Sequence, residues 1–137
     1  MDANVLIEMP TGKIELVYPE LSYQIVGAAF DVYNEIGNGH HEKYYQRALA
    51  ESFRNRNLTF QEQVFGPLKF NRKTIGKSFF DFLVENRVIV EIKKGERFSK
   101  SNIDQVLEYL KTSKLQLALL INFANDRVKF RRIVNLS

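Results

Sequence analysis

The apolar residues of the first half of the chain recur at helical spacing. They are three or four positions apart and define one face of a helix that opens near Pro19, since proline is tolerated in a first turn. This stripe consists of Leu21, Ile25, Ala28, Val32 and Ile36. The segment "GNG" at 37–39 ends the helix because glycine accepts the left-handed conformation. A second helix is predicted from about His41 to Arg56.

From residue 58 onward the spacing becomes that of strands. Three segments rich in Phe and Val are predicted as strands and are interrupted by Gly66-Pro67 and by Gly76. These segments are 58–65, 77–86 and 87–94. We expect no strand to continue through the interruptions.

Helical spacing returns once more before two final strands. Residues 101–113 are predicted as a helix, with Ser101 and Asp104 placed as a capping box. Residues 115–123 are almost unbroken apolar, which predicts a central strand covered on both faces. Residues 127–134 alternate and suit an edge strand.

The order of these elements predicts the fold class. Helix, helix, three strands, helix and two strands (α-α-β-β-β-α-β-β) indicate an α/β or α+β domain with a mixed central sheet flanked by helices. Neither a repeat nor a flexible linker divides the chain, so we expect one domain over 1–137. Residues 1–19 are its N-terminal lead-in, in which 13–18 form a short strand or extended segment.

Composition narrows the class of protein. The chain has 137 residues, 45% of them hydrophobic, and no cysteine, which excludes disulfides and thiolate chemistry and suits a reducing, cytoplasmic location. No segment approaches the roughly 18 continuous apolar residues of a membrane span, so no membrane partner is expected. The N-terminus lacks the pattern of a secretion signal.

Positive charge is unevenly distributed along the chain. Residues 1–20 have a net charge of −3, and the remaining residues have a net charge of +7. A basic body suits binding to a polyanion such as nucleic acid, because each neutralised phosphate releases counterions. Ordinary solubility charge accounts for the same numbers nearly as well.

An acid and a base interrupt the apolar strand "VIVEIKK". Side chains alternate along a strand, so Ile89, Glu91 and Lys93 share one face, and the opposite face is entirely apolar. Glu91 and Lys93 are then roughly 6–7 Å apart. One interpretation is an ion pair on a solvated face, which is common and contributes little stability. The other is a functional site.

The neighbouring strand brings a second acid, Asp81. If the hairpin loop has three residues, 85–87, Asp81 lies directly opposite Glu91; with a two-residue loop the acids face opposite sides. Two facing carboxylates repel unless a cation lies between them. Hard cations such as Mg²⁺ or Mn²⁺ prefer carboxylate oxygens, and a lysine beside them can stabilise charge that develops on a phosphate.

These spacings resemble a known superfamily. Asp81, then Glu91-Ile92-Lys93 on adjacent strands before a helix, resembles the PD-(D/E)XK nuclease core, although Phe80 replaces the proline of that signature. "GHHEKYY" (39–45) reads Gly-x-x-Glu-x-x-Tyr and is similar to the GxxExxY family of that superfamily. "LLINF" (119–123) is similar to that family's late strand.

The resemblance implies a restriction-endonuclease-like core and a role for each matched residue. Asp81, Glu91 and Glu42 would bind metal, and Lys93 would be the catalytic lysine. Glu42 falls on the same helical stripe as Tyr45, which predicts that it packs inward; the alternative is an acid favoured by the helix dipole.

Gln105 and Tyr109 are similar to the Gln-x-x-x-Tyr motif of RecB-type nucleases. We count both among the catalytic candidates, at the rim of the cleft. The alternative for this pair is plain solvent exposure, since the two residues lie roughly opposite the apolar stripe of their helix.

Basic residues near the candidate site suit contacts to a phosphate backbone. They are Lys94, Arg97, Lys100, Lys73 and Lys77.

The sequence therefore predicts a Mg²⁺- or Mn²⁺-dependent nuclease that acts on nucleic acid, DNA in preference to RNA. The small size predicts that it needs a homodimer or a partner to embrace a duplex. The competing hypothesis is a non-catalytic module that binds nucleic acid or protein on the same fold.

Overall fold

The computed structural model describes residues 6–8 and 14–136. A two-stranded sheet of β1 (Leu6–Glu8) and β2 (Ile14–Leu16) precedes the main body. The main body consists of α1 (Pro19–Ile36), α2 (Glu42–Asn55), β3 (Phe60–Phe70), β4 (Lys73–Val84), β5 (Val88–Lys94), α3 (Lys100–Ser113), β6 (Leu117–Phe123) and β7 (Val128–Val134). The predicted order of elements is confirmed. Of the expected lead-in strand, β2 is found, and Lys13 lies outside the described residues.

The five-stranded sheet has the order β3-β4-β5-β6-β7. All neighbours are antiparallel except β5 and β6, which are parallel and are joined by α3, because parallel strands need a crossover connection. Every residue of β6 is buried, which confirms the central strand, and β7 lies at an edge as expected. The mixed sheet flanked by helices is therefore confirmed.

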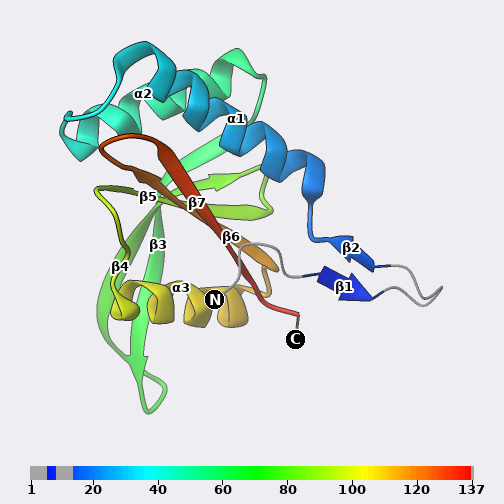
Figure 1. The fold of residues 1–137 in the computed structure, drawn as a ribbon. Helices are drawn as coiled ribbons and strands as arrows, with labels where there is room; N and C mark the ends of the chain where they lie inside the picture. The colour runs from blue at the N-terminus through cyan, green and yellow to red at the C-terminus, as the bar shows by residue number, and fades with distance from the viewer. Residues whose placement is uncertain (1–5, 9–13, 137) are drawn as a thin grey trace.

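Helices cover both faces of this sheet, α1 and α2 on one side and α3 on the other (Figure 1). β5 contributes to both cores by alternation, with Val88, Val90 and Ile92 in the α1/α2 core and Ile89 in the α3 core. Glu91 and Lys93 therefore lie on the α3 face, with Ile89.

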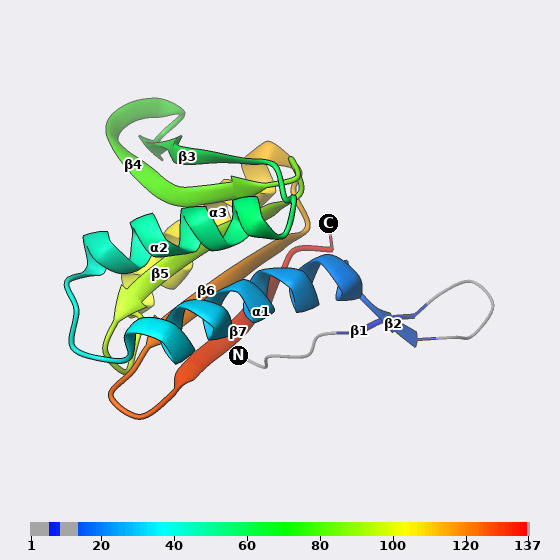
Figure 2. The same cartoon turned by 90° about the horizontal axis from the view of Figure 1, so that it is seen from above.

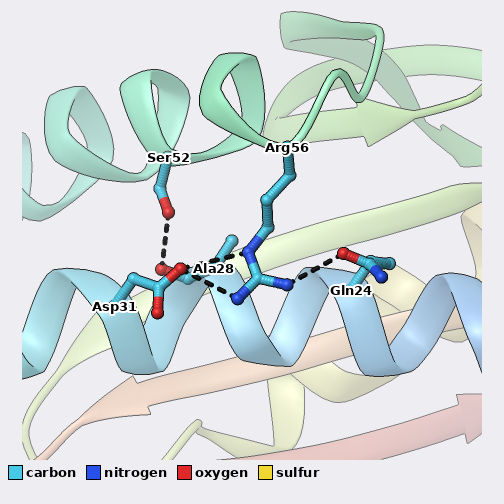
Figure 3. A network of polar contacts seen from close by, with 5 residues as sticks. All are labelled: Gln24, Ala28, Asp31, Ser52 and Arg56. Atoms are coloured by element: carbon cyan, nitrogen blue, oxygen red, sulfur yellow. Dashed lines mark hydrogen bonds and ion pairs between the residues drawn. The ribbon is translucent and has the colours of Figure 1, made fainter.

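A network of polar contacts fastens α2 to α1 (Figure 3). The Arg56 guanidinium donates to Asp31 Oδ2 at 2.9 and 3.1 Å and to Gln24 Oε1 at 2.8 Å. Ser52 Oγ donates to the Ala28 carbonyl at 2.9 Å. Gly27 leaves the space for this arrangement, since a Cβ there would lie 2.9 Å from the guanidinium nitrogens of Arg56. The contacts fix the position of α2, whose first turn reaches the candidate site.

The start of α3 differs from the predicted capping box. Ser99, not Ser101, is the N-cap, and its hydroxyl accepts from the Asn102 N–H at 3.1 Å. Asp104 instead pairs with Lys100 at 2.9 Å. Both serines are suitable N-caps in sequence, and the helix begins two residues earlier than the pattern predicted.

β3 and β4 are longer than expected and run through the glycines that were taken as interruptions. Pro67 is tolerated because β3 is an edge strand with one side free of ladder bonds. Gly66 is required by packing, since a Cβ there would lie 2.5 Å from the Phe80 ring. The two strands therefore extend as a long hairpin (Figure 2), whose outer part, 64–79, we call the arm.

Candidate functional site

Asp81 and Glu91 bridge adjacent strands with their carboxylates. The backbone N–H of Asp81 donates to Glu91 Oε1 at 2.6 Å, and the N–H of Ile92 donates to Asp81 Oδ2 at 2.8 Å. β4 and β5 pair at Val84–Val88, Leu83–Ile89 and Phe82–Val90, so the hairpin loop has three residues. The same register extended by one residue sets Asp81 opposite Glu91, which is the arrangement required for a shared site.

The sheet ladder is interrupted on both sides of Asp81. β4 pairs with β5 only as far as Phe82, and beyond that point the two carboxylates take the place of ladder bonds. On the other side, Gln63 of β3 is skipped in the pairing and has a φ of +52°. A non-glycine residue in the left-handed region inside a strand is uncommon and is often found near functional sites.

At Gln63 and Asp81 the two strands turn over, so that side chains of the same parity face α3 before this point of β4 and face α1 and α2 after it. Phe80 belongs to the α3 core and Phe82 to the α1/α2 core, although residues two apart on a regular strand share a face. The hairpin therefore twists at this point, and Asp81 occupies the break. A carboxylate can enter the sheet here because the strand neighbours have separated.

Burial raises the pKa of both carboxyl groups, which makes them weaker acids. It is the main cause that raises the pKa of Glu91 to about 8, followed by the negative charge of Asp81. Burial also raises the pKa of Asp81, while its hydrogen bond from the Ile92 N–H opposes the rise. Glu42 raises the pKa of both by charge repulsion. A cation beside the pair would favour the ionised form of both carboxylates.

Lys93 lies two residues beyond Glu91 on the same face and is exposed. Both residues belong to the described part of the chain, and no ion pair joins them there. The interpretation as an ordinary surface ion pair therefore has no support in the structure. The ammonium group of Lys93 is left available to solvent or to a ligand.

Glu42 stands at the first turn of α2 and is exposed, so the prediction that it packs inward is wrong. Its helical stripe is buried only from Tyr45 onward, because the helix begins at Glu42 itself. Glu42 Oε1 accepts from the N–H of Lys94 at 3.1 Å, at the end of β5. The acid thus links the start of α2 to the strand that carries Glu91 and Lys93.

The loop before α2 is held by Tyr45. Its hydroxyl donates to the Gly37 carbonyl at 2.6 Å, and its ring stacks on Phe123 with centroids 4.3 Å apart. Gly39 has a φ of +86°, which favours glycine. Gly39, Glu42 and Tyr45 therefore have distinct structural tasks: the turn, the link to β5 and the anchor in the core.

Gln105 and Tyr109 face the hairpin of β3 and β4. Both are half-buried, which rules out plain solvent exposure for this pair. Gln105 Oε1 accepts from Ser78 Oγ at 3.4 Å, and the Tyr109 ring lies 4.8 Å from that of Phe80. Burial raises the pKa of Tyr109. Both residues therefore contact β4 upstream of Asp81, and no contact with Asp81 or Glu91 is seen for either.

The basic candidates are all exposed. They are Lys73 and Lys77 on β4, Lys94 at the end of β5, and Arg97 and Lys100 before and in α3. Lys100 is paired with Asp104, and Lys77 lies 5.7 Å from the ring centroid of Phe79. They border two regions, the arm and the carboxyl end of β5.

Sequence interpretation missed a set of polar residues next to Lys93. Asn122 on β6 pairs in register with Lys93 and with Lys129 of β7. Asn122 is only 7% exposed. The signal was visible as the single polar residue inside "LALLINF", where a buried strand would otherwise contain none.

The three acids predicted as one metal site are only partly brought together. Among the residues that the structure describes, no three or more His, Cys, Asp or Glu side chains are gathered closely enough to hold a metal ion. Asp81 and Glu91 form a pair, and Glu42 acts on them through its charge. Carboxylate oxygens still fit a hard divalent cation, which usually takes one or two protein carboxylates and completes its shell with phosphate and water.

Comparison with known proteins identifies the class. The family model described as the PD-(D/E)XK nuclease superfamily matches residues 19–133. The match covers most of the chain, from the start of α1 into β7, and the chain belongs to this superfamily.

Other comparisons are more distant. A solved structure described as "Crystal structure of SSO0001" has 13% sequence identity and a TM-score of 0.44, and the alignment covers 85% of this chain and 78% of that chain. No curated protein matches the chain. None of the helices in the described residues is long and apolar enough to cross a membrane.

Proposed function

We propose that this protein is a divalent-metal-dependent nuclease with its active site at Asp81, Glu91 and Lys93. The observation that carries the proposal is the pair of carboxylates at the break between β4 and β5, with an unpaired lysine two residues further along the same face. Membership of the PD-(D/E)XK nuclease superfamily supports the same conclusion.

Asp81 and Glu91 are the metal ligands in this proposal, and Mg²⁺ or Mn²⁺ is the metal. A cation bound there would polarise the phosphodiester and lower the pKa of a bound water. Their raised pKa values, which come chiefly from burial, support this assignment because a cation beside the pair would favour the ionised form of both. Glu42 positions the water or serves as a further ligand, as its negative charge acts on both carboxyls.

Lys93 stabilises the negative charge that develops on the phosphate. Gln105 and Tyr109 support the substrate strand from α3, because they line the flank of β4 that leads to Asp81. The particular family we propose is GxxExxY, for which Gly39, Glu42 and Tyr45 supply the motif and have separate structural tasks.

Nucleic acid is the proposed substrate, DNA in preference to RNA. The arm supports nucleic acid as the substrate, since residues 64–79 contain four basic residues and no acid, and the cleavage assay below decides between DNA and RNA. Its exposed Phe65 and Phe79 rings lie 5.8 Å apart and offer a surface on which bases can stack. A homodimer or a partner protein that encloses a duplex stays a prediction, which light scattering of the protein with and without duplex DNA tests.

The deciding experiment is cleavage of labelled single-stranded, duplex and branched DNA and of RNA with Mg²⁺ or Mn²⁺. Asp81→Asn and Lys93→Ala should each lower the cleavage rate by at least about a hundredfold, the scale for loss of a principal electrostatic group. Two control variants remove the same kind of charge at exposed positions. Asp126→Asn, in the β6–β7 turn, matches Asp81→Asn, and Lys111→Ala, in α3, matches Lys93→Ala; both should cleave like wild type.

The same assay separates the two hypotheses. If wild type and Lys93→Ala show equal background cleavage on every substrate, the enzyme proposal is wrong. Binding without cleavage would then favour the module that holds nucleic acid. The observation in favour of that alternative is that the described residues assemble two acids, not three, at the site.

A further inference from the structure

A cavity lined by charged, amide and phenylalanine side chains lies beside the candidate site, on the same face of the sheet. It has a volume of about 240 Å³ and is lined by residues of β6, β7 and the loop before α3. Lys93, Asn122 and Lys129 are register partners across β5, β6 and β7. Neighbouring strands are about 4.8 Å apart, so the cavity begins one strand away from Lys93.

Two buried nitrogen atoms in the wall of this cavity have no hydrogen-bond partner. Asn122 Nδ2 and Arg131 Nε are inaccessible to solvent, and neither finds an acceptor among the described residues. Asn122 as a whole is only 7% exposed. A buried donor without an acceptor is costly and rare in native proteins. Both donors belong to residues that line the cavity.

The groups around the cavity are mostly positive and mostly donors. Arg97, Lys129 and Arg131 line it, against one carboxylate, Glu96. Glu96 is paired with Lys129 at 3.4 Å, which leaves the two arginines uncompensated. Arginine, lysine and the amide NH₂ group all donate hydrogen bonds, and guanidinium groups match the geometry of phosphate oxygens.

We propose that this cavity is a phosphate-binding subsite that holds a phosphate group of the nucleic-acid strand next to the one at Asp81 and Glu91. On binding, the side chains of Asn122 and Arg131 turn their buried nitrogens toward the cavity and donate to the phosphate oxygens, and Arg97 neutralises the charge from the rim. The identity of the ligand rests on the proposed nuclease function, which supplies the substrate class. The subsite fixes the register of the strand relative to Lys93.

Two sources of the phosphate are distinguished by the choice of oligonucleotide. Binding of labelled single strands with a 5′-phosphate, a 3′-phosphate or neither is measured by fluorescence anisotropy in the presence of a chelator, so that no cleavage occurs. Tighter binding of one phosphorylated end identifies a terminal phosphate, and equal binding identifies an internal one. In either case Arg131→Gln should weaken binding about tenfold, the loss expected for a charge-assisted contact.

Arg127→Gln is the matched control. Arg127 is exposed in the β6–β7 turn, so this substitution removes the same charge at a position outside the cavity. It should stay within about twofold of wild type and should reduce the salt dependence less than Arg131→Gln does. A direct measurement uses inorganic phosphate as the probe. Its titration should shift the side-chain NMR signals of Asn122 and Arg131 Nε in the wild-type protein.

The outcomes separate this subsite from the nuclease proposal. Equal affinities for Arg131→Gln and Arg127→Gln, together with unshifted Asn122 and Arg131 signals, overturn the subsite even when metal-dependent cleavage is present. Phosphate-dependent shifts and an Arg131-dependent affinity support it even when the protein cleaves nothing. Circular dichroism of each variant confirms that the loss is not one of folding.

Discussion

Glu91 is the residue whose ionisation responds most clearly to its surroundings. Burial, with the charge of Asp81, raises its pKa to about 8, compared with 4.5 for an ordinary glutamate. The folded protein therefore keeps a proton that the unfolded chain releases. Stability from this group is fully present below the unfolded pKa and is lost as the pH rises through the folded pKa.

We therefore expect the free energy of unfolding of the metal-free protein to fall as the pH rises from about 5 to about 8, by an amount on the order of one to a few kcal/mol. Glu91→Gln keeps an acceptor for the Asp81 N–H but cannot ionise, so most of this pH dependence should disappear. Urea unfolding at several pH values measures the effect. Glu108→Gln, at an exposed position of α3, should leave the slope as it is in wild type, and an unchanged slope in Glu91→Gln would contradict the assignment.

Gln63 shows backbone strain at single-residue scale. Its φ of +52° is unfavourable for a β-branched side chain and easy for glycine. Gln63→Val should therefore be less stable than Gln63→Gly by about 1–2 kcal/mol. At Gln61, which pairs regularly with Leu83, the order should reverse because valine favours strands. Thermal unfolding of the four variants tests this, and the same order at both positions would show that the left-handed turn is not formed.

At the scale of elements, the contact between α1 and α2 opposes the helix propensity of residue 27 to the ion pair of Arg56 with Asp31. Gly27→Ala gains about 1 kcal/mol of helix propensity, but its Cβ displaces the Arg56 side chain from Asp31. Half-exposed ion pairs of this kind contribute only about 0.2–1 kcal/mol, so the substitution should be neutral or slightly stabilising. In an Arg56→Ala background the full gain of about 1 kcal/mol should appear. A double-mutant cycle by urea unfolding measures the difference, and equal gains in both backgrounds would mean that Arg56 does not occupy the space above Gly27.

The arm is the element whose side chains suit base stacking. Phe65 and Phe79 are about half exposed and adjacent across the hairpin. Phe79→Ala should weaken binding of a single-stranded oligonucleotide by about 1–3 kcal/mol, the usual range for one stacked base. Tyr23→Ala removes an exposed ring from α1 and should not change the affinity. Equal affinities for the two variants would place the strand elsewhere on the protein.

Features of these elements that depend on nearby residues could be predicted from the sequence, and features that depend on pairing between distant strands could not. The helices and the faces of β5 follow from residue spacing. The sequence left a two-residue and a three-residue hairpin loop open, and the pairing of β4 with β5 decides for the three-residue loop that sets Asp81 opposite Glu91. The twist at Gln63 could not be predicted, because it arises from the pairing of three strands and leaves no mark in composition. Gly66-Pro67 indicated a break by its local preference, but an edge position and the Phe80 ring made both residues acceptable inside β3.

At the scale of the whole molecule, the candidate site depends on elements far apart in the sequence. Asp81 and Glu91 come from one hairpin, Glu42 arrives from the start of α2, and the Asn122 cavity comes from β6 and β7. A motif can name the acids, but only the folded sheet shows that Glu42 reaches the backbone of Lys94. In the proposed metal site the two acids would supply only part of a coordination shell, so metal affinity and nucleic-acid binding should be coupled.

Mn²⁺ should stabilise the folded protein by mass action, by about 2.7 kcal/mol at a metal concentration of a hundred times Kd, and should therefore raise its melting temperature. Asp81→Ala should abolish this shift in melting temperature. Mg²⁺ and Mn²⁺ complete their coordination with phosphate oxygens, so a single-stranded oligonucleotide should lower the metal concentration needed for half of the shift. The Lys93→Ala variant prevents cleavage during the measurement and keeps both carboxylates. Asp126→Ala, an exposed acid in the β6–β7 turn, should behave like its parent. Identical shifts in Asp81→Ala and Asp126→Ala would place the metal away from the break between β4 and β5, and the carboxylate pair would then be a structural bridge between two strands.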